Sequence, residues 1–295
     1  MTSDQALRFN NIRNVLLIVL VLNWAVALAK IIFGLSTQFT GMMADGFHSL
    51  SDGASNIVGL IGITIACRPA DKDHPYGHKK YETLFSLAIA ALLFFVCYEL
   101  LAKAIDRFRH PVVPEINIGS FVIMIITIAI NVLVMRYERK QGEHLRSDIL
   151  VSDSIHTASD VFISISVIAA IIFIKMGYPI LDPIITTIIA VFIAHAAFTI
   201  ARQSSNVLCD AIILDDKKIE KLVLSVKDVK ACHKIRTRGR EDDIHVDLHV
   251  LVSPDMHVEK AHKISYEIEG TIRAAIPGVT DVVVHIEPQE KRKLV

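Results

Sequence analysis

The sequence predicts a membrane bundle of six transmembrane helices followed by a small cytosolic α+β domain with the element order αββαβ. Hydrophobic residues make up 52% of the 295 residues and charged residues only 21%, and the mean hydropathy is +0.46. A chain this apolar is typical of a membrane protein. After about residue 209 the pattern changes to that of a soluble domain, so we predict a transmembrane domain over 1–208 and a second, soluble domain over 209–295.

Apolar runs of spanning length define the first domain, because about 20 apolar residues in a helix cross the hydrocarbon core. The first run follows Arg8 and Arg13 and is too long for the apolar core of a cleavable signal peptide, so we expect it to remain as a span. The six expected spans lie near 14–34, 40–66, 82–103, 117–135, 149–174 and 179–203.

Charge placement predicts the orientation of these spans. The N-terminal tail and the second and fourth loops carry ten Lys and Arg residues, whereas the other loops carry four. Because positive loops stay inside, both termini are expected in the cytoplasm. Lys plus Arg and Asp plus Glu both total 31, so no overall charge bias points to a nucleic-acid partner.

The C-terminal segment alternates between helical and strand patterns. A helix is expected over DDKKIEKLVLSV, strands near 229–238 and 243–252, a helix near 257–275 and a strand near 280–287. In DIHVDLHVLV the apolar residues alternate with His245, Asp247 and His249, as a strand with one buried and one polar face requires.

Two nearly identical polar motifs lie inside the second and fifth expected spans, DGFHSLSD at 45–52 and DSIHTASD at 153–160. Positions i, i+3 and i+7 share one face of a helix, so each motif forms a polar stripe. We expect the two helices to run antiparallel, as in an inverted repeat, so that the stripes meet. The aligned residues are Asp45, His48 and Asp52 in the first motif and Asp153, His156 and Asp160 in the second.

Several carboxylates in mid-membrane require a cation to offset them, because each charge costs roughly 2.5–3.5 kcal/mol to insert. Two imidazoles and two carboxylates, from His48, Asp52, His156 and Asp160, form a tetrahedral set suited to Zn²⁺. Asp45 and Asp153 are expected to orient the histidine rings. The alternative is that these side chains only hydrogen-bond helix to helix, although the repetition favours a metal.

A second candidate site lies in the loop after the second span. Asp71, His74 and His78 place three potential ligands within eight residues just outside the membrane, a spacing compatible with one metal ion. A polar juxtamembrane loop without a metal is the alternative.

Taken together, HSLSD, HTASD and the loop RPADKDHPYGHKKYE resemble the motifs of the cation diffusion facilitator family, bacterial zinc and iron efflux type, and the αββαβ tail is similar to that family's metallochaperone-like (ferredoxin-like) C-terminal domain. The resemblance implies a transport domain over 1–208 and a cytosolic metal-binding, regulatory and dimerising domain over 209–295. The resemblance covers nearly the whole chain. It implies a homodimeric exporter of divalent metal driven by inward proton flow, with the paired motifs as transport site and the loop as second site.

The resemblance also implies a cytosolic metal cluster in the tail. His285 and Glu287 alternate onto one strand face and His249 lies on the polar face of its own strand, so these ligands are able to converge. His245 is a possible additional ligand. The matching residues are His233, His249, His262, His285 and Glu287.

The function expected from the sequence is efflux of divalent metal, most simply Zn²⁺ exchanged for protons by alternating access. Metal binding requires neutral histidine and ionised aspartate, so loading displaces protons. Fe²⁺, Mn²⁺, Co²⁺ and Cd²⁺ stay open as substrates, as does a membrane metal sensor that moves no ion. An enzyme is not expected, because no H-E-x-x-H motif or nucleophile elbow accompanies the site. The loop between the fourth and fifth spans has only His144 and lacks a His-rich tract, which favours a prokaryotic inner-membrane protein.

Overall fold

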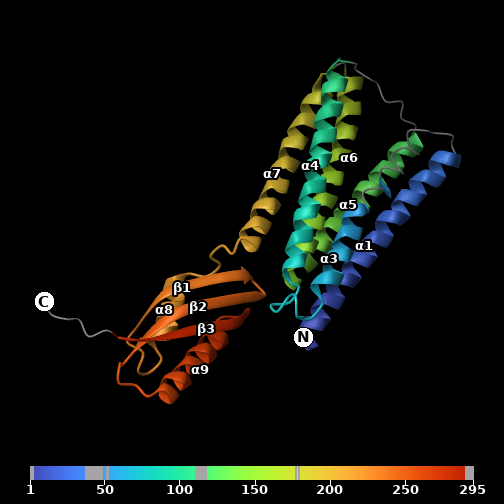
Figure 1. The fold of residues 1–295 in the computed structure, drawn as a ribbon. Helices are drawn as coiled ribbons and strands as arrows, with labels where there is room; N and C mark the ends of the chain where they lie inside the picture. Colours follow the sequence, from blue (N-terminus) through green and yellow to red (C-terminus); the bar gives the residue numbers. More distant parts are fainter. Residues whose placement is uncertain are drawn as a thin grey trace. The chain divides into compact units, whose positions relative to one another are not determined.

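The computed structural model describes residues 3–36, 49–50, 53–109, 118–176, 178 and 180–289. The chain divides into two compact units, 1–205 and 206–295. Figure 1 shows a bundle of long helices in the first unit and a small sheet with two helices in the second. Each unit is described by itself.

The first unit confirms the predicted helical transmembrane region. Among the described helices, four are long and apolar enough to cross a membrane: Leu7–Ile32, Lys80–Arg109, Phe121–Leu145 and Pro183–Leu208. The helices are α1 (Ser3–Ser36), α3 (Ala54–Ala66), α4 (Lys80–Arg109), α5 (Ile118–Leu145), α6 (Asp148–Lys175) and α7 (Leu181–Leu208).

The bundle exposes apolar side chains and buries, beside its apolar core, a set of polar ones. Helix α6 buries a run of polar side chains, Ser152, Asp153, Ser154, His156, Thr157 and Ser159, whereas α7 exposes Ile188, Val191, Phe192 and Phe198. Lipid is as apolar as these exposed side chains, so it solvates them readily, while polar groups need partners inside the bundle. The polar stripe of α6 therefore lies against the neighbouring helices.

Helices α3 and α4 approach closely at Gly62. A Cβ atom added to Gly62 would lie 2.5 Å from the Cβ atom of Phe85, a separation that real side chains do not adopt. Glycine is therefore required for this approach of α3 to α4.

A partly buried ion pair joins one end of α1 to α4 and to the α5–α6 turn. The Arg8 guanidinium donates to the carbonyl oxygens of Leu145 at 2.8 Å and Arg146 at 2.9 Å, and its Nη2 lies 3.2 Å from Oε2 of Glu82. Ser147 donates to the other Glu82 oxygen at 2.6 Å. Arg8 thus satisfies carbonyl groups left open at the C-terminus of α5, where a cation is favoured.

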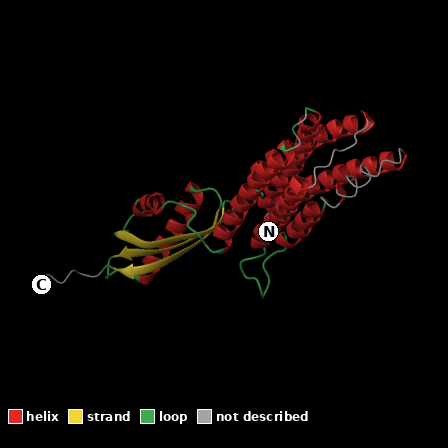
Figure 2. Cartoon of the chain, turned by 90° about the horizontal axis from the view of Figure 1, so that it is seen from above, coloured by secondary structure: helices red, strands yellow, loops and turns green. Residues whose placement is uncertain are grey.

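The second unit has the predicted order αββαβ: α8 (Asp216–Leu224), β1 (Ala231–Arg240), β2 (Asp243–Val252), α9 (Val258–Ala275) and β3 (Val279–Pro288). Strands β1 and β2 pair antiparallel, and β3 pairs parallel with β2. Figure 2 shows the three strands side by side. The parallel pair requires a crossover connection, which α9 provides.

The two faces of the sheet differ as the alternation predicted. Val246, Leu248 and Val250 are fully or almost fully buried and pack with Ile264 and Ile268 of α9. The intervening residues of β2 are only partly buried. Consequently α9 covers the apolar face, and the histidines of β2 lie on the opposite face.

Candidate metal sites

Helix α6 holds one half of the predicted transport site. His156 is 5% exposed, and neither Nδ1 nor Nε2 of its ring has a hydrogen-bond partner within the described ranges. Asp160 follows one helical turn later on the same face. Asp45, His48 and Asp52, the other half of the predicted site, lie outside the described residues.

Asp153 does not orient the ring of His156, contrary to the sequence-based expectation. It is completely buried, and its Oδ2 accepts a hydrogen bond from the Asn56 side chain of α3. Asn56 in turn accepts a bond from Asn23 of α1 at 3.0 Å. Asp153 therefore connects α6 to α3 and α1, and it leaves the imidazole nitrogens of His156 available for another ligand.

Sequence reasoning missed Glu138 of α5. It is completely buried and its Oε2 accepts a hydrogen bond from Thr157 of α6 at 2.9 Å. In the sequence it stands in the charged string RYERK, which looks like the flank of a span. Its position in the bundle follows from α5 continuing to Leu145, about ten residues beyond the apolar run that ends near residue 135.

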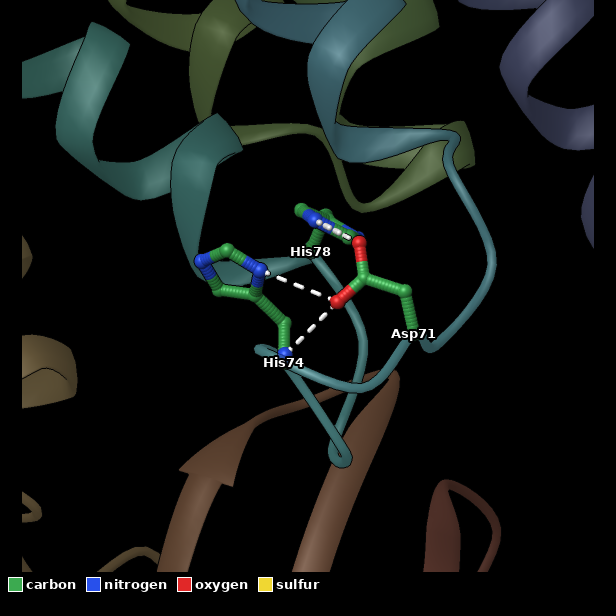
Figure 3. A group of neighbouring side chains, drawn as sticks. All are labelled: Asp71, His74 and His78. Carbon is green, nitrogen blue, oxygen red and sulfur yellow. Dashed lines mark hydrogen bonds and ion pairs between the residues drawn. The ribbon is translucent and has the colours of Figure 1, made fainter.

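The loop residues come together as predicted. One ligand atom each from Asp71, His74 and His78 lies within 4.8 Å of the others, and Figure 3 shows both rings next to the carboxylate. Oδ1 of Asp71 accepts the backbone N–H of His74 at 2.7 Å and lies 3.2 Å from its Nδ1, while Oδ2 lies 3.4 Å from Nε2 of His78. The backbone hydrogen bond from His74 lowers the pKa of Asp71 below its ordinary value, which favours the ionised form that binds metal.

His78 is set up as a nitrogen ligand. Its Nδ1 lies 3.1 Å from the Pro69 carbonyl oxygen, which only accepts hydrogen bonds, so Nδ1 carries the proton and Nε2 of the neutral ring is an acceptor. Nε2 then faces a carboxylate oxygen of Asp71, which is also an acceptor. Two acceptors attract each other only through a cation between them, a proton or a metal ion. The arrangement fits a metal site.

The tail residues form a row across the sheet. His233 pairs with His249 across β1 and β2, and His249 pairs with His285 across β2 and β3. Glu287 lies two residues further along β3, on the same face. Its Oε1 is 2.8 Å from Nδ1 of His249, and its Oε2 is 3.3 Å from Nε2 of His233.

Three members of this row meet the geometry of a metal site, because ligand atoms of His233, His249 and Glu287 lie within 4.8 Å of one another. The ring of His285 lies beside that of His249, with centroids 4.6 Å apart and the ring planes tilted by 49°. The hydrogen bond from the His249 ring lowers the pKa of Glu287, which keeps the carboxylate ionised for a cation.

The structure places His262 and His245 apart from this group. His262 lies on α9, which covers the opposite face of the sheet, and its ring packs edge-on against Tyr266 at 4.7 Å. His245 interacts with two carboxylates, Asp243 at 3.7 Å and Asp281 at 3.7 Å. The pKa of His245 is raised by its hydrogen bond to Asp243.

The chain matches family models over both of its units. Residues 16–209 match the cation efflux transmembrane domain, and residues 214–289 match the cytoplasmic domain of cation efflux proteins. The chain belongs to the cation diffusion facilitator family.

Relatives of this cation diffusion facilitator extend over nearly its full length. An uncharacterized transporter of Methanocaldococcus jannaschii is 33% identical over 92% of this chain and 96% of its own. The manganese efflux system protein MneP of Bacillus subtilis is 30% identical over 94% of this chain and 96% of its own. The cation-efflux pump FieF of Shewanella oneidensis is 25% identical over 88% of each chain. The chain is accordingly a membrane-embedded efflux transporter of divalent metal cations.

Proposed function

We propose that this cation diffusion facilitator exports Zn²⁺ in exchange for protons, at a site formed by His48, Asp52, His156 and Asp160. The observation that carries the proposal is the buried ring of His156, whose two nitrogens have no partner in the described part of the chain. A buried polar group without a partner is costly. An imidazole kept in this state, one turn from a carboxylate, is suited to receive a metal ion.

Contacts between α3 and α6 support a site shared by the two motifs. Asn56 follows Asp52 by four residues in the sequence, and it donates to Asp153, which precedes His156 by three. The segment after the first motif is therefore bound to the helix that carries the second, as a site built from both motifs requires.

The other two groups complete the proposed route and its regulation. Asp71, His74 and His78 would bind the cation next to the bundle, and His233, His249 and Glu287, with His285 beside them, would sense cytosolic metal. We place the protein in the cytoplasmic membrane as a homodimer with both termini in the cytoplasm. Ten basic residues against four in the alternate loops support this orientation.

Metal flux into proteoliposomes tests the proposal, with Zn²⁺, Fe²⁺, Mn²⁺, Co²⁺ and Cd²⁺ offered separately at equal pH and under a pH gradient. Asp160→Ala should abolish zinc flux and leave a folded protein, because three ligands hold zinc poorly. Asp106→Ala, at an exposed position of α4, is the matched control and should transport normally. Zinc binding without flux in the native protein would favour a sensor, and faster flux of Mn²⁺ than of Zn²⁺ would reassign the substrate.

A further inference from the structure

The interface between α5 and α6 contains a pair of carboxyl groups outside the two metal-binding clusters and the proposed ligand set. Glu138 of α5 and Asp153 of α6 are both 0% exposed, and their side chains interact directly with each other. Each is also hydrogen-bonded to neutral side chains, Glu138 to Thr157 and Asp153 to Asn56 and Ser55.

The remaining oxygen of each carboxyl group is unsatisfied. Oε1 of Glu138 and Oδ1 of Asp153 are buried and have no hydrogen-bond donor within the ranges that the structure describes. An ionised carboxyl group only accepts hydrogen bonds. If both groups were ionised, they would repel each other inside the membrane bundle, and neither of these two oxygens would have a hydrogen-bond donor.

A metal ion is not the cation that the geometry favours here. The described residues form two groups whose ligand atoms converge within 4.8 Å, one in the loop and one in the tail, and Glu138, Asp153 and His156 do not form a third. A proton needs only the two carboxyl groups. It converts one of them into a donor, satisfies the other and removes one negative charge.

We propose that Glu138 and Asp153 share one proton and are the proton-carrying pair of this transporter. The proton lies on one carboxyl group and is donated in a hydrogen bond to the other. When it leaves, it passes to water on one side of the membrane and the pair becomes doubly negative. When the pair is reprotonated from the other side, it returns to a single negative charge.

The pair is electrostatically coupled to the proposed transport site, and in this respect the inference rests on the proposed function. The charged or titratable groups that act on the pair from α6 are Asp160, which influences Glu138, and His156, which influences Asp153. From α3 the neutral side chains of Ser55 and Asn56 act on Asp153, and Asn56 in turn accepts a hydrogen bond from Asn23 of α1. A divalent cation bound at His156 and Asp160 would favour loss of the shared proton, and reprotonation would weaken the binding of the cation.

The test compares Glu138→Gln with Glu143→Gln in the full-length protein. Glu143 stands on the same helix but is exposed, with a partner in Arg139 at 2.9 Å, so it undergoes the same chemical change without burial. Two rates are measured in proteoliposomes, the exchange of zinc for zinc at equal pH and the net zinc flux with and without a pH gradient. Infrared difference spectra in H₂O and D₂O record any protonated carboxyl group.

We expect Glu138→Gln to keep zinc exchange, to lose the stimulation of net flux by the pH gradient and to lose the infrared band of a protonated carboxyl group. Glu143→Gln should keep all three. Full stimulation in Glu138→Gln, or a wild-type spectrum without that band, would overturn the proposal. If Glu138→Gln fails to fold, Asp153→Asn must remove the band instead, and its persistence would equally count against the pair.

Failure of the proposed transport site has a different signature. In that case the native protein would show no zinc exchange at all, while the infrared band and its loss in Glu138→Gln would still report on the shared proton.

Discussion

His233 and His249 are partners across the β1–β2 ladder, with ring centroids 5.4 Å apart and the carboxylate of Glu287 within 3.3 Å of a nitrogen of each. The Cα register of the ladder places the rings side by side, so strand pairing sets the geometry of this candidate metal site. A carboxylate from β3 then completes it.

This arrangement predicts which histidines hold metal in the tail. His249→Ala combined with His285→Ala should lower the metal stoichiometry of the tail. It should also weaken any metal-dependent closing of the two tail domains of the proposed dimer. His262→Ala, on the other face of the sheet, is the control and should bind as the native protein does. Titration calorimetry of zinc into the 206–295 unit measures the metal stoichiometry of the double variant and of the control. An equal loss of bound metal in the control and in the double variant would show that the ligands come from both faces of the sheet.

The loop site predicts a difference between two neighbouring aspartates. Asp71→Asn removes the carboxylate between His74 and His78 and should weaken zinc binding at the loop roughly 10–100-fold, the range for lost ligand-supporting groups. Asp73→Asn changes a residue outside the three-residue group and should have little effect. Equilibrium binding of zinc to the detergent-purified protein distinguishes them. Similar affinities for the two variants would remove Asp71 from the site.

The pKa of His245 predicts how the stability of the tail depends on pH. The raised pKa means that protonated His245 is favoured in the folded domain by Asp243. The stabilisation is complete below the ordinary histidine pKa of about 6.5 and is lost as pH rises through the higher folded value. Asp243→Asn should reduce this loss. The free energy of unfolding of the 206–295 unit is measured with urea between about pH 5 and pH 9, in buffers about one pH unit apart. It should depend less on pH in the variant than in the native unit. An unchanged pH dependence would mean that Asp243 does not stabilise protonated His245.

Two glycines predict opposite effects of the same substitution. Gly62→Ala would force a Cβ atom to 2.5 Å from Phe85 and should destabilise the bundle by roughly 1–3 kcal/mol. At Gly270 in α9 an added Cβ meets nothing within 4 Å, so Gly270→Ala should stabilise the tail by roughly 0.5–1 kcal/mol through helix propensity. Unfolding of each unit, followed separately, gives both values. A neutral Gly62→Ala would mean that α3 and α4 separate without cost.

The nitrogen ligands of the proposed transport site predict metal selectivity. His48→Asp or His156→Asp should keep zinc transport but admit more Mn²⁺ or Cd²⁺, because a carboxylate-rich site discriminates less against oxygen-preferring or larger ions. The flux should also persist to lower pH, since an aspartate ordinarily loses its proton well below a histidine. His144→Asp, at an exposed position near the end of α5, is the control. An unaltered ion ranking in both transport-site variants would exclude these histidines as ligands.

Local patterns account for what the sequence predicted well. Alternation in DIHVDLHVLV assigned the buried and polar faces of β2, and the short spacing of Asp71, His74 and His78 is sufficient for their side chains to converge. Both depend on residues close together in the chain, where strand or loop geometry leaves few alternatives.

Relations between elements were predicted less well. Hydropathy identifies only the part of a helix that matches the hydrocarbon core, so the continuation of α5 past residue 135, and with it the burial of Glu138, could not be foreseen. The assignment of Asp153 to His156 failed for a similar reason, because Asn56 of another helix competes for its carboxylate. His262 has the right residue type, but the side of the sheet that α9 covers depends on packing of its isoleucines.

The contacts of Arg8 have a consequence for biosynthesis. Its guanidinium binds the carbonyl oxygen of Arg146, 138 residues later in the chain, so α1 enters the membrane long before its partner exists. At about 5–20 residues per second, the ribosome takes roughly 7–28 s to make the intervening segment. Until Glu82 is made, 74 residues after Arg8, the charge of Arg8 has neither of these partners and must be solvated by water or lipid headgroups. Completion of the α5–α6 turn is therefore the earliest moment at which the first helix can reach its native position.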